Sequence, residues 1–136
     1  MASYPGTKAA PAAPGLTEDQ QAKAMAGCFS ILALWGAGNA EMRSILGAPA
    51  ERTFFEWKAG RMRRVPADTI RRIGYVAGIY KALQILYADP AQADGWVRRP
   101  NRHFGGQTPL ERMSAGDVTD LAAVRAYLDA ARAPWS

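Results

Sequence analysis

A run of apolar residues at helical spacing follows Pro66 and sets the centre of the expected fold. The run consists of Ile70, Ile73, Val76, Ala77, Tyr80, Leu83 and Leu86. Residues three or four apart lie on one face of a helix, and proline is well suited to a first helical turn. We therefore expect a long helix that opens at Pro66, with this apolar stripe as the spine of the hydrophobic core.

Shorter segments with the same periodicity lie on both sides of this run. Two of them begin with capping-box pairs, Thr17 with Gln20 and Thr108 with Glu111, and we expect Asn39 to cap another. We expect these helices near residues 18–36, 39–46, 50–57, 90–96, 109–115 and 118–132. No alternation of apolar and polar residues persists for the length of a strand. The sequence therefore predicts an all-α fold.

The composition of the chain suggests how it is divided. Residues 1–15 are mostly Ala, Pro and Gly, and such a stretch buries too little apolar surface to offset its ordering entropy. We expect a flexible leader there, a helix-turn-helix-like region at 16–89 and a small helical region at 90–136. The single cysteine, Cys28, excludes an intrachain disulfide framework. Because no apolar run approaches the roughly 18 residues that span a bilayer, we expect a soluble, cytoplasmic protein.

The residue patterns of common catalytic and metal sites are missing from the sequence. The one histidine, His103, has no cysteine cluster and no second histidine to complete a zinc site. The paired glycines at 36 and 38 and at 105 and 106 lack the Lys and Ser/Thr of a P-loop. A G-x-S-x-G nucleophile elbow does not occur. We therefore expect no catalytic residue, no metal and no cofactor.

The turn from Gly47 to Pro49 separates two short predicted helices, as in a helix-turn-helix unit. Between Glu41 and Arg72, eight basic residues stand against four acidic ones, and this surplus suits a phosphate backbone. With residues 50–58 as the recognition helix, the candidate DNA contacts are Arg52, Thr53, Lys58, Arg61, Arg63 and Arg64. The alternative is an ordinary pair of core helices with solvated arginines.

An ordered series of motifs marks the C-terminal part of the chain. It consists of Trp96, Pro100 with Asn101, FGGQTPLERMSAGD at 104–117 and LAAVRAYLDAAR at 121–132. Upstream, the long predicted helix carries an Ile-Tyr-x-Ala-Leu core formed by Ile79, Tyr80, Ala82 and Leu83. From about residue 37 to its end, the chain resembles the Xre/MbcA/ParS antitoxins, the partners of RES-domain toxins.

This resemblance implies a non-enzymatic antitoxin of a type II toxin–antitoxin system. Its partner would be a RES-domain toxin that degrades NAD or transfers its ADP-ribose, with all catalytic residues on that partner. It further implies binding to its own double-stranded promoter, and we expect a homodimer within a hetero-oligomeric complex. Toxin binding would fall to the C-terminal region, where we single out Arg99, Asn101, Arg102, Phe104, Arg125, Arg132, Trp135 and Ser136.

The C-terminal tail and the overall function each leave alternatives open. We expect Trp135 to help plug the NAD-binding cleft of the toxin, because aromatic anchors are enriched at interface hot spots. The alternative is that Trp135 folds back on its own core. Two other functions compete with the antitoxin: a stand-alone helix-turn-helix transcription regulator, and a small helical enzyme with an unrecognised site. A neighbouring gene for a RES-like protein would favour the antitoxin.

Overall fold

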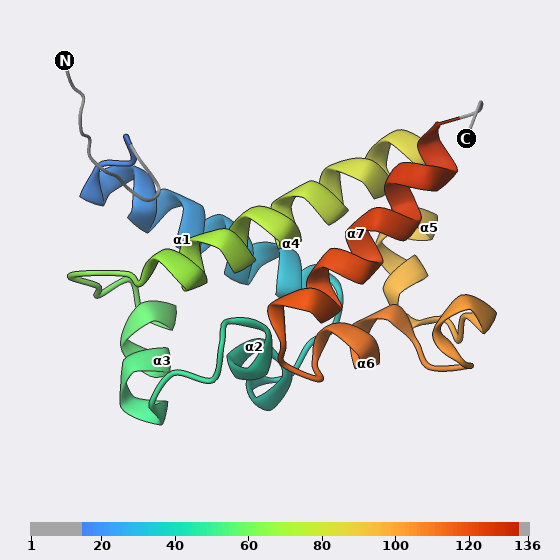
Figure 1. The fold of residues 1–136 in the computed structure, drawn as a ribbon. Coiled ribbons are helices and arrows are strands. Elements are labelled where there is room, and N and C mark those ends of the chain that lie inside the picture. Colours follow the sequence, from blue (N-terminus) through green and yellow to red (C-terminus); the bar gives the residue numbers. More distant parts are fainter. Residues whose placement is uncertain (1–14, 134–136) are drawn as a thin grey trace, which may run out of the picture.

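The computed structural model describes residues 15–133, and every regular element within that range is a helix (Figure 1). The helices are α1 (Glu18–Leu34), α2 (Asn39–Ile45), α3 (Glu51–Lys58), α4 (Ala67–Leu86), α5 (Pro90–Gly95), α6 (Pro109–Met113) and α7 (Val118–Arg132). Two 3-10 turns, η2 (Trp96–Arg98) and η3 (Arg102–Phe104), lie between α5 and α6. The prediction of an all-α fold is confirmed. The expected leader, apart from Gly15, lies outside the described residues.

Helix α4 is the central element, as its apolar periodicity predicted. It crosses the molecule and packs against α7 and α1 (Figure 1). Its buried residues are Thr69, Arg72, Ile73, Val76, Ile79, Ala82 and Leu83. The expectation that Ala77 lies on the buried stripe is wrong. A stripe centred on Val76 and Ile79 turns position 77 toward solvent, and Ala77 is exposed.

Three helices, α1, α6 and α7, begin at the residues that the sequence predicted. Thr17 caps α1 and Thr108 caps α6, each through a complete capping box. Asp117 caps α7 by accepting a hydrogen bond from the amide of Thr119. Such caps satisfy amide groups that have no partner inside the helix, so they can be recognised without knowledge of the tertiary fold.

Two other helix starts differ by one position from the expectation. Asn39 is the first helical residue of α2, and Gly38 occupies its cap position. The amide of Gly38 donates to Glu41 Oε1 at 2.9 Å, whereas the Asn39 side chain accepts a hydrogen bond from Lys58 instead of capping the helix. Pro66 caps α4, which begins at Ala67, because its backbone is extended at ψ 147°.

A single hydrophobic core joins the two expected regions of the chain. Leu32 of α1, Val76 of α4 and Val124 of α7 are fully buried members of the same cluster. Within the described residues, the regions 16–89 and 90–133 therefore share their packing. The division of the chain at residue 90 remains a hypothesis about function. Within the described range, no helix is both long enough and apolar enough to cross a membrane.

Candidate functional site

A tight turn joins α2 to α3. Gly47 has φ +100° and Ala48 has φ +55°, so the chain passes through the left-handed region at two consecutive residues. The amide of Ala48 donates to the carbonyl of Arg43 at 2.8 Å, and Arg43 Nε donates to the carbonyl of Pro49. Arg43 therefore contacts both sides of the turn through its backbone and its side chain. This arrangement fixes how α3 is presented relative to α2.

Helix α3 buries one face and exposes the other. Phe54 and Trp57 are 1% and 5% exposed and belong to the hydrophobic core. On the opposite face, the side chain of Arg52 is 90% exposed and forms a long 3.6 Å ion pair with Glu56. An exposed pair of this kind contributes little to stability, so the guanidinium of Arg52 is available to a partner.

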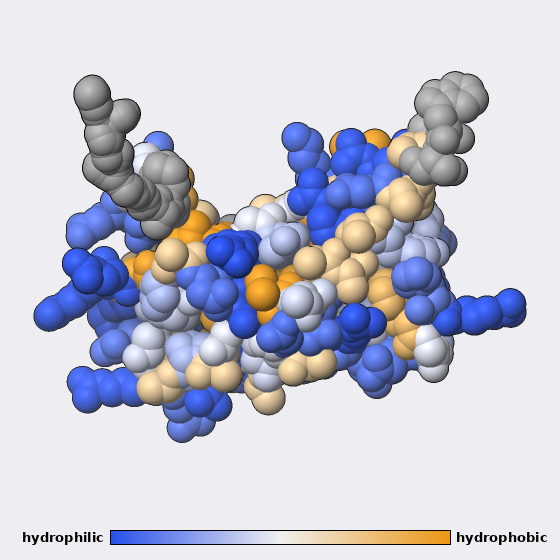
Figure 2. Space-filling view, viewed as in Figure 1, coloured by the Kyte–Doolittle hydropathy of each residue, from blue (hydrophilic) through white to orange (hydrophobic). Residues whose placement is uncertain are grey.

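A groove of about 480 Å³ opens between the end of α3 and the loop that leads to α4. Its lining includes Thr53, Glu56, Arg61, Arg63 and Arg64. The structure therefore brings Thr53 together with the three predicted loop arginines, all of which are exposed. Arg52 and Lys58 do not line the groove, and Lys58 Nζ donates to Asn39 Oδ1 on α2. Long hydrophilic side chains project from the edge of the molecule where this loop lies (Figure 2).

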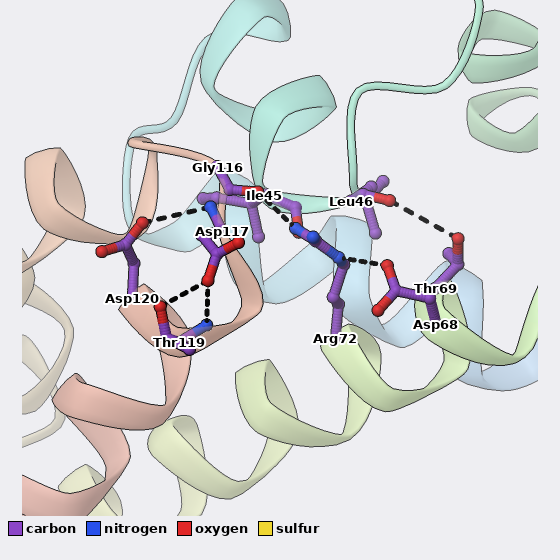
Figure 3. Close-up of polar contacts among 9 residues, drawn as sticks. All are labelled: Ile45, Leu46, Asp68, Thr69, Arg72, Gly116, Asp117, Thr119 and Asp120. Carbon is purple, nitrogen blue, oxygen red and sulfur yellow. Dashed lines mark hydrogen bonds and ion pairs between the residues drawn. The ribbon is translucent and has the colours of Figure 1, made fainter.

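A buried arginine joins the end of α2 to the turn between α6 and α7 (Figure 3). Arg72 of α4 is 8% exposed, and its Nη1 donates to the carbonyls of Ile45 at 3.3 Å and Gly116 at 2.9 Å. Its Nε pairs with Asp68 Oδ2 at 2.7 Å. Because a buried charge is tolerated when its donors are satisfied, the guanidinium holds three parts of the chain together.

The surroundings of Arg72 are adapted to this contact. A Cβ atom at Gly47 would lie 3.2 Å from Arg72 Nε, so glycine at this position leaves room for the guanidinium. The pKa of Asp117, at the start of α7, is lowered by hydrogen bonds from the side chain and backbone of Thr119, and further by the charge of Arg72. The start of α7 is thus electrostatically linked to α4.

The loop between η2 and α6 is closed on itself by hydrogen bonds. The amide of Asn101 donates to the carbonyl of Gln107 at 2.9 Å, and the amide of Gly106 donates to the carbonyl of Asn101 at 3.0 Å. Asn101 Oδ1 accepts from the amide of His103 at 2.9 Å and so caps η3. Gly105 and Gly106 have φ +67° and +91°, backbone conformations that residues with a Cβ atom rarely adopt.

Aromatic rings attach this loop to α7. Trp96 is stacked on Tyr127 with ring centroids 5.9 Å apart, and the rings of His103 and Phe104 lie 4.7 and 5.6 Å from the same tyrosine. Trp96 thus anchors the loop through Tyr127. Offset and tilted rings at these distances attract one another, so the loop has a fixed position on α7.

Comparison with known proteins places this arrangement in a family. Residues 82–133 match the model of the antitoxin Xre/MbcA/ParS C-terminal toxin-binding domain. The uncharacterized protein y4oB of Sinorhizobium fredii (strain NBRC 101917 / NGR234) is 43% identical over 105 residues, which cover 76% of this chain and 80% of that protein. The chain belongs to the Xre/MbcA/ParS antitoxin family. The resemblance seen in the sequence motifs is thereby confirmed, and the chain is an antitoxin.

In this antitoxin, three of the arginines expected to contact the toxin are exposed: Arg99, Arg102 and Arg132. Asn101 is half-buried and shapes the loop through its hydrogen bonds. Trp135 and Ser136 lie outside the described residues.

Two other expected toxin contacts are less accessible. Phe104 is 5% exposed and packs beneath the guanidinium of Arg112, whose carbon lies 5.9 Å from the ring centre. It supports the loop from within and offers a partner very little surface. Arg125 is half-buried and bonds Asp129 Oδ1 at 3.1 Å. It lies over Gly78 of α4, where a Cβ atom would fall 1.7 Å from Arg125 Nη1.

Sequence reasoning missed two arginines that tie the antitoxin together. Arg72 stands four residues before Val76 on the apolar stripe of α4, and a charged residue in that phase is the signal that could have predicted its burial. Arg98 Nη1 donates to the carbonyl of Gly36 at 3.0 Å, which connects η2 to the end of α1. Among residues 15–133, no group of three or more His, Cys, Asp or Glu side chains is placed to hold a metal ion.

Proposed function

We propose that this antitoxin binds a RES-domain toxin and blocks its consumption of NAD or its transfer of ADP-ribose. The observation that carries the proposal is the match of residues 82–133 to a toxin-binding domain. That segment contains the closed loop, the aromatic cluster around Tyr127 and the whole of α7. The reaction would belong to the toxin, and this chain would act by covering the toxin's surface rather than by catalysis.

The exposed arginines of the closed loop are well suited to contact the toxin. Arg99 and Arg102 are exposed, and neither forms an ion pair with a carboxylate within the described part of the chain. A guanidinium binds carboxylate or phosphate groups through two parallel hydrogen bonds. Asn101 holds the loop between these two side chains, and Arg125 and Arg132 would extend the contact along α7.

Co-expression with the product of the neighbouring gene tests this proposal. The wild-type antitoxin should co-purify with that protein and restore growth that the protein alone arrests. Replacing Arg99 and Arg102 together with Ala should weaken the complex, because a hydrogen bond to a charged group contributes about 1.5–3 kcal/mol. Full neutralisation by this double variant would contradict the role of the loop. NAD turnover by the purified antitoxin alone would contradict the assignment of the reaction to the toxin.

The complex is also proposed to bind its own double-stranded promoter through α3 and the loop that follows it. Support comes from the groove that gathers Thr53 with Arg61, Arg63 and Arg64, and from the exposure of Arg52. In Figure 1, α3 and the loop that follows it lie at the left of the molecule, whereas the closed loop lies at the right. A toxin bound at one end would therefore leave the other end open to DNA.

Replacement of the three loop arginines with Ala tests DNA binding separately from toxin binding. Each lost phosphate contact should reduce the salt dependence of binding, by a slope of about 0.9 per contact. Promoter binding in mobility shifts should weaken, while growth rescue should persist because the closed loop is intact. The Arg99 and Arg102 double variant is the matched control, since it should lose rescue but keep DNA binding. Mobility shifts that are unchanged in the triple variant would contradict the DNA surface.

Two further proposals concern the tail and the assembly. Deleting residues 134–136 should weaken toxin inhibition if Trp135 and Ser136 contact the toxin, and folding should be retained. A homodimer within the complex should favour DNA half-sites about one helical turn apart.

A stand-alone transcription regulator is the second candidate function, favoured by the basic groove at the end of α3. Promoter binding without any co-purifying toxin would favour it.

A further inference from the structure

An exposed aromatic ring stands on α3 and has no role in the core. Phe55 is 45% exposed, whereas the neighbouring Phe54 is 1% exposed. The two rings meet edge to face with centroids 5.1 Å apart, and Phe54 makes the same kind of contact with Phe29 of α1 at 5.7 Å. The ring of Phe55 is therefore held from beneath, while its outer part is open to a partner.

The surroundings of Phe55 indicate the charge of that partner. Phe55 lines a groove of about 360 Å³ between α2 and α3, together with Arg43 and the acidic Glu51. On the same helix, Arg52 lies three residues before it with a side chain that is 90% exposed. The exposed arginines 61, 63 and 64 follow on the adjoining loop. Between residues 51 and 64, five basic residues stand against the two acidic residues Glu51 and Glu56. The ring therefore lies on a basic stretch, which fits an anionic partner that also offers a small apolar group.

We propose that Phe55 recognises thymine by packing against its methyl group in the major groove of DNA. The inference rests on the proposed DNA binding and specifies one base contact within it. A helix about 10–12 Å across fits the major groove, which is about 12 Å wide. The thymine C5-methyl is the apolar group on the base edges there, and phenylalanine is one of the side chains that contact it. Phosphates on either side would meet the arginines around Phe55.

The methyl group can be removed from the DNA without any change in the protein. The probe is the fragment upstream of this gene, amplified with either dTTP or dUTP, because uracil lacks the methyl group but keeps the pairing edge. Burying one methyl group contributes about four-fold in affinity. We therefore expect the wild-type protein to bind the uracil fragment about four-fold more weakly per methyl group contacted. Phe55→Ala should bind the thymine fragment more weakly and should show little difference between the two fragments.

Two further variants separate a base contact from a general effect. Phe55→Leu keeps an apolar side chain and should retain part of the preference for thymine. Ile85→Ala removes another exposed apolar side chain, 54% exposed on α4, and should keep the full preference. Because alanine favours helix, both alanine variants should keep their helices. Thermal unfolding checks that each variant is folded.

Each result either supports or overturns the inference. A wild-type protein that binds both fragments equally would overturn it and leave the proposed DNA binding intact. The same thymine preference in Phe55→Ala and wild type would also overturn it, as would a change in oligomeric state on replacing Phe55, which would assign the ring to self-association. A wild-type protein that binds neither fragment would remove the proposed DNA binding and this inference together.

Discussion

Replacing Arg72 with Met should destabilise the antitoxin strongly, although Arg72 is not among the residues proposed to contact DNA or the toxin. The side chain of Arg72 is 9% exposed, and its Nη1 supplies hydrogen bonds to two backbone carbonyls that are distant in sequence. Met fills a comparable space with apolar atoms, so the change removes hydrogen bonds and charge with little loss of packing. The perturbation therefore isolates the contribution of the guanidinium.

The magnitude follows from the groups that lose their partner. The carbonyls of Ile45 and Gly116 would each lose the hydrogen bond from Arg72, at about 1–3 kcal/mol for a buried group. The partner Asp68 is 54% exposed, so water replaces that ion pair at small cost. Relief of the buried charge offsets part of the loss. We expect the free energy of unfolding to fall by about 2–4 kcal/mol, or roughly 6–12 °C in melting temperature.

Urea unfolding followed by circular dichroism measures this change, and Arg71→Met is the matched control. Arg71 is adjacent on α4, is exposed, and forms no ion pair within residues 15–133. Its replacement should change the free energy of unfolding by less than about 0.5 kcal/mol. Equal stability of the two variants would refute the argument, because it would show that the buried guanidinium contributes no more than a solvated one.

Three other substitutions or treatments test separate parts of the fold. Burial raises the pKa of Cys28 to about 12. An alkylating reagent near pH 8 should therefore modify this thiol far more slowly in the folded protein than in the urea-unfolded chain. Mass spectrometry measures both rates, and equal rates would contradict the prediction. Gly36→Ala should lower the free energy of unfolding by about 1–2 kcal/mol, because Gly36 has φ +77° and a Cβ there would fall 2.1 Å from Arg98 Nη1. An unchanged melting temperature would contradict this prediction. The lowered pKa of Asp117 means that its contribution to stability is present above its ordinary pKa of 3.8 and is lost as the pH falls through the lowered value. The stability difference between wild type and Asp117→Ala should therefore shrink in acid, and a pH-independent difference would count against the carboxylate as the source.

Features that depend on neighbouring residues in the sequence were predictable. The caps at Thr17, Thr108 and Asp117 each rest on a side chain that reaches an amide two or three residues away. These interactions are decided within one turn of the chain, so the sequence contains all the information they need.

Features that depend on distant parts of the chain were missed. Arg72 is buried because Ile45 and Gly116, 27 and 44 residues away in sequence, each present a carbonyl to it. The periodicity of α4 shows which face is apolar, but it does not show what lies opposite that face. Asn39 was expected to cap α2, but it is the first helical residue, and its Oδ1 accepts a hydrogen bond from Lys58, 19 residues away in sequence.

The boundary of the toxin-binding segment falls inside α4, and this placement has a physical consequence. Residues 82–133 contain α7, whose buried side chains are Leu121, Val124 and Leu128. Helix α7 packs chiefly on α4, but most of α4, from Ala67 to Lys81, precedes that segment. Arg72 then ties the start of α7 to the end of α2 through the same helix. The core of this segment is therefore continuous with that of the rest of the chain. The surface proposed to bind the toxin and the surface proposed to bind DNA are held in place by one shared helix, so a substitution in that helix should affect both, whereas a substitution in either loop should affect one.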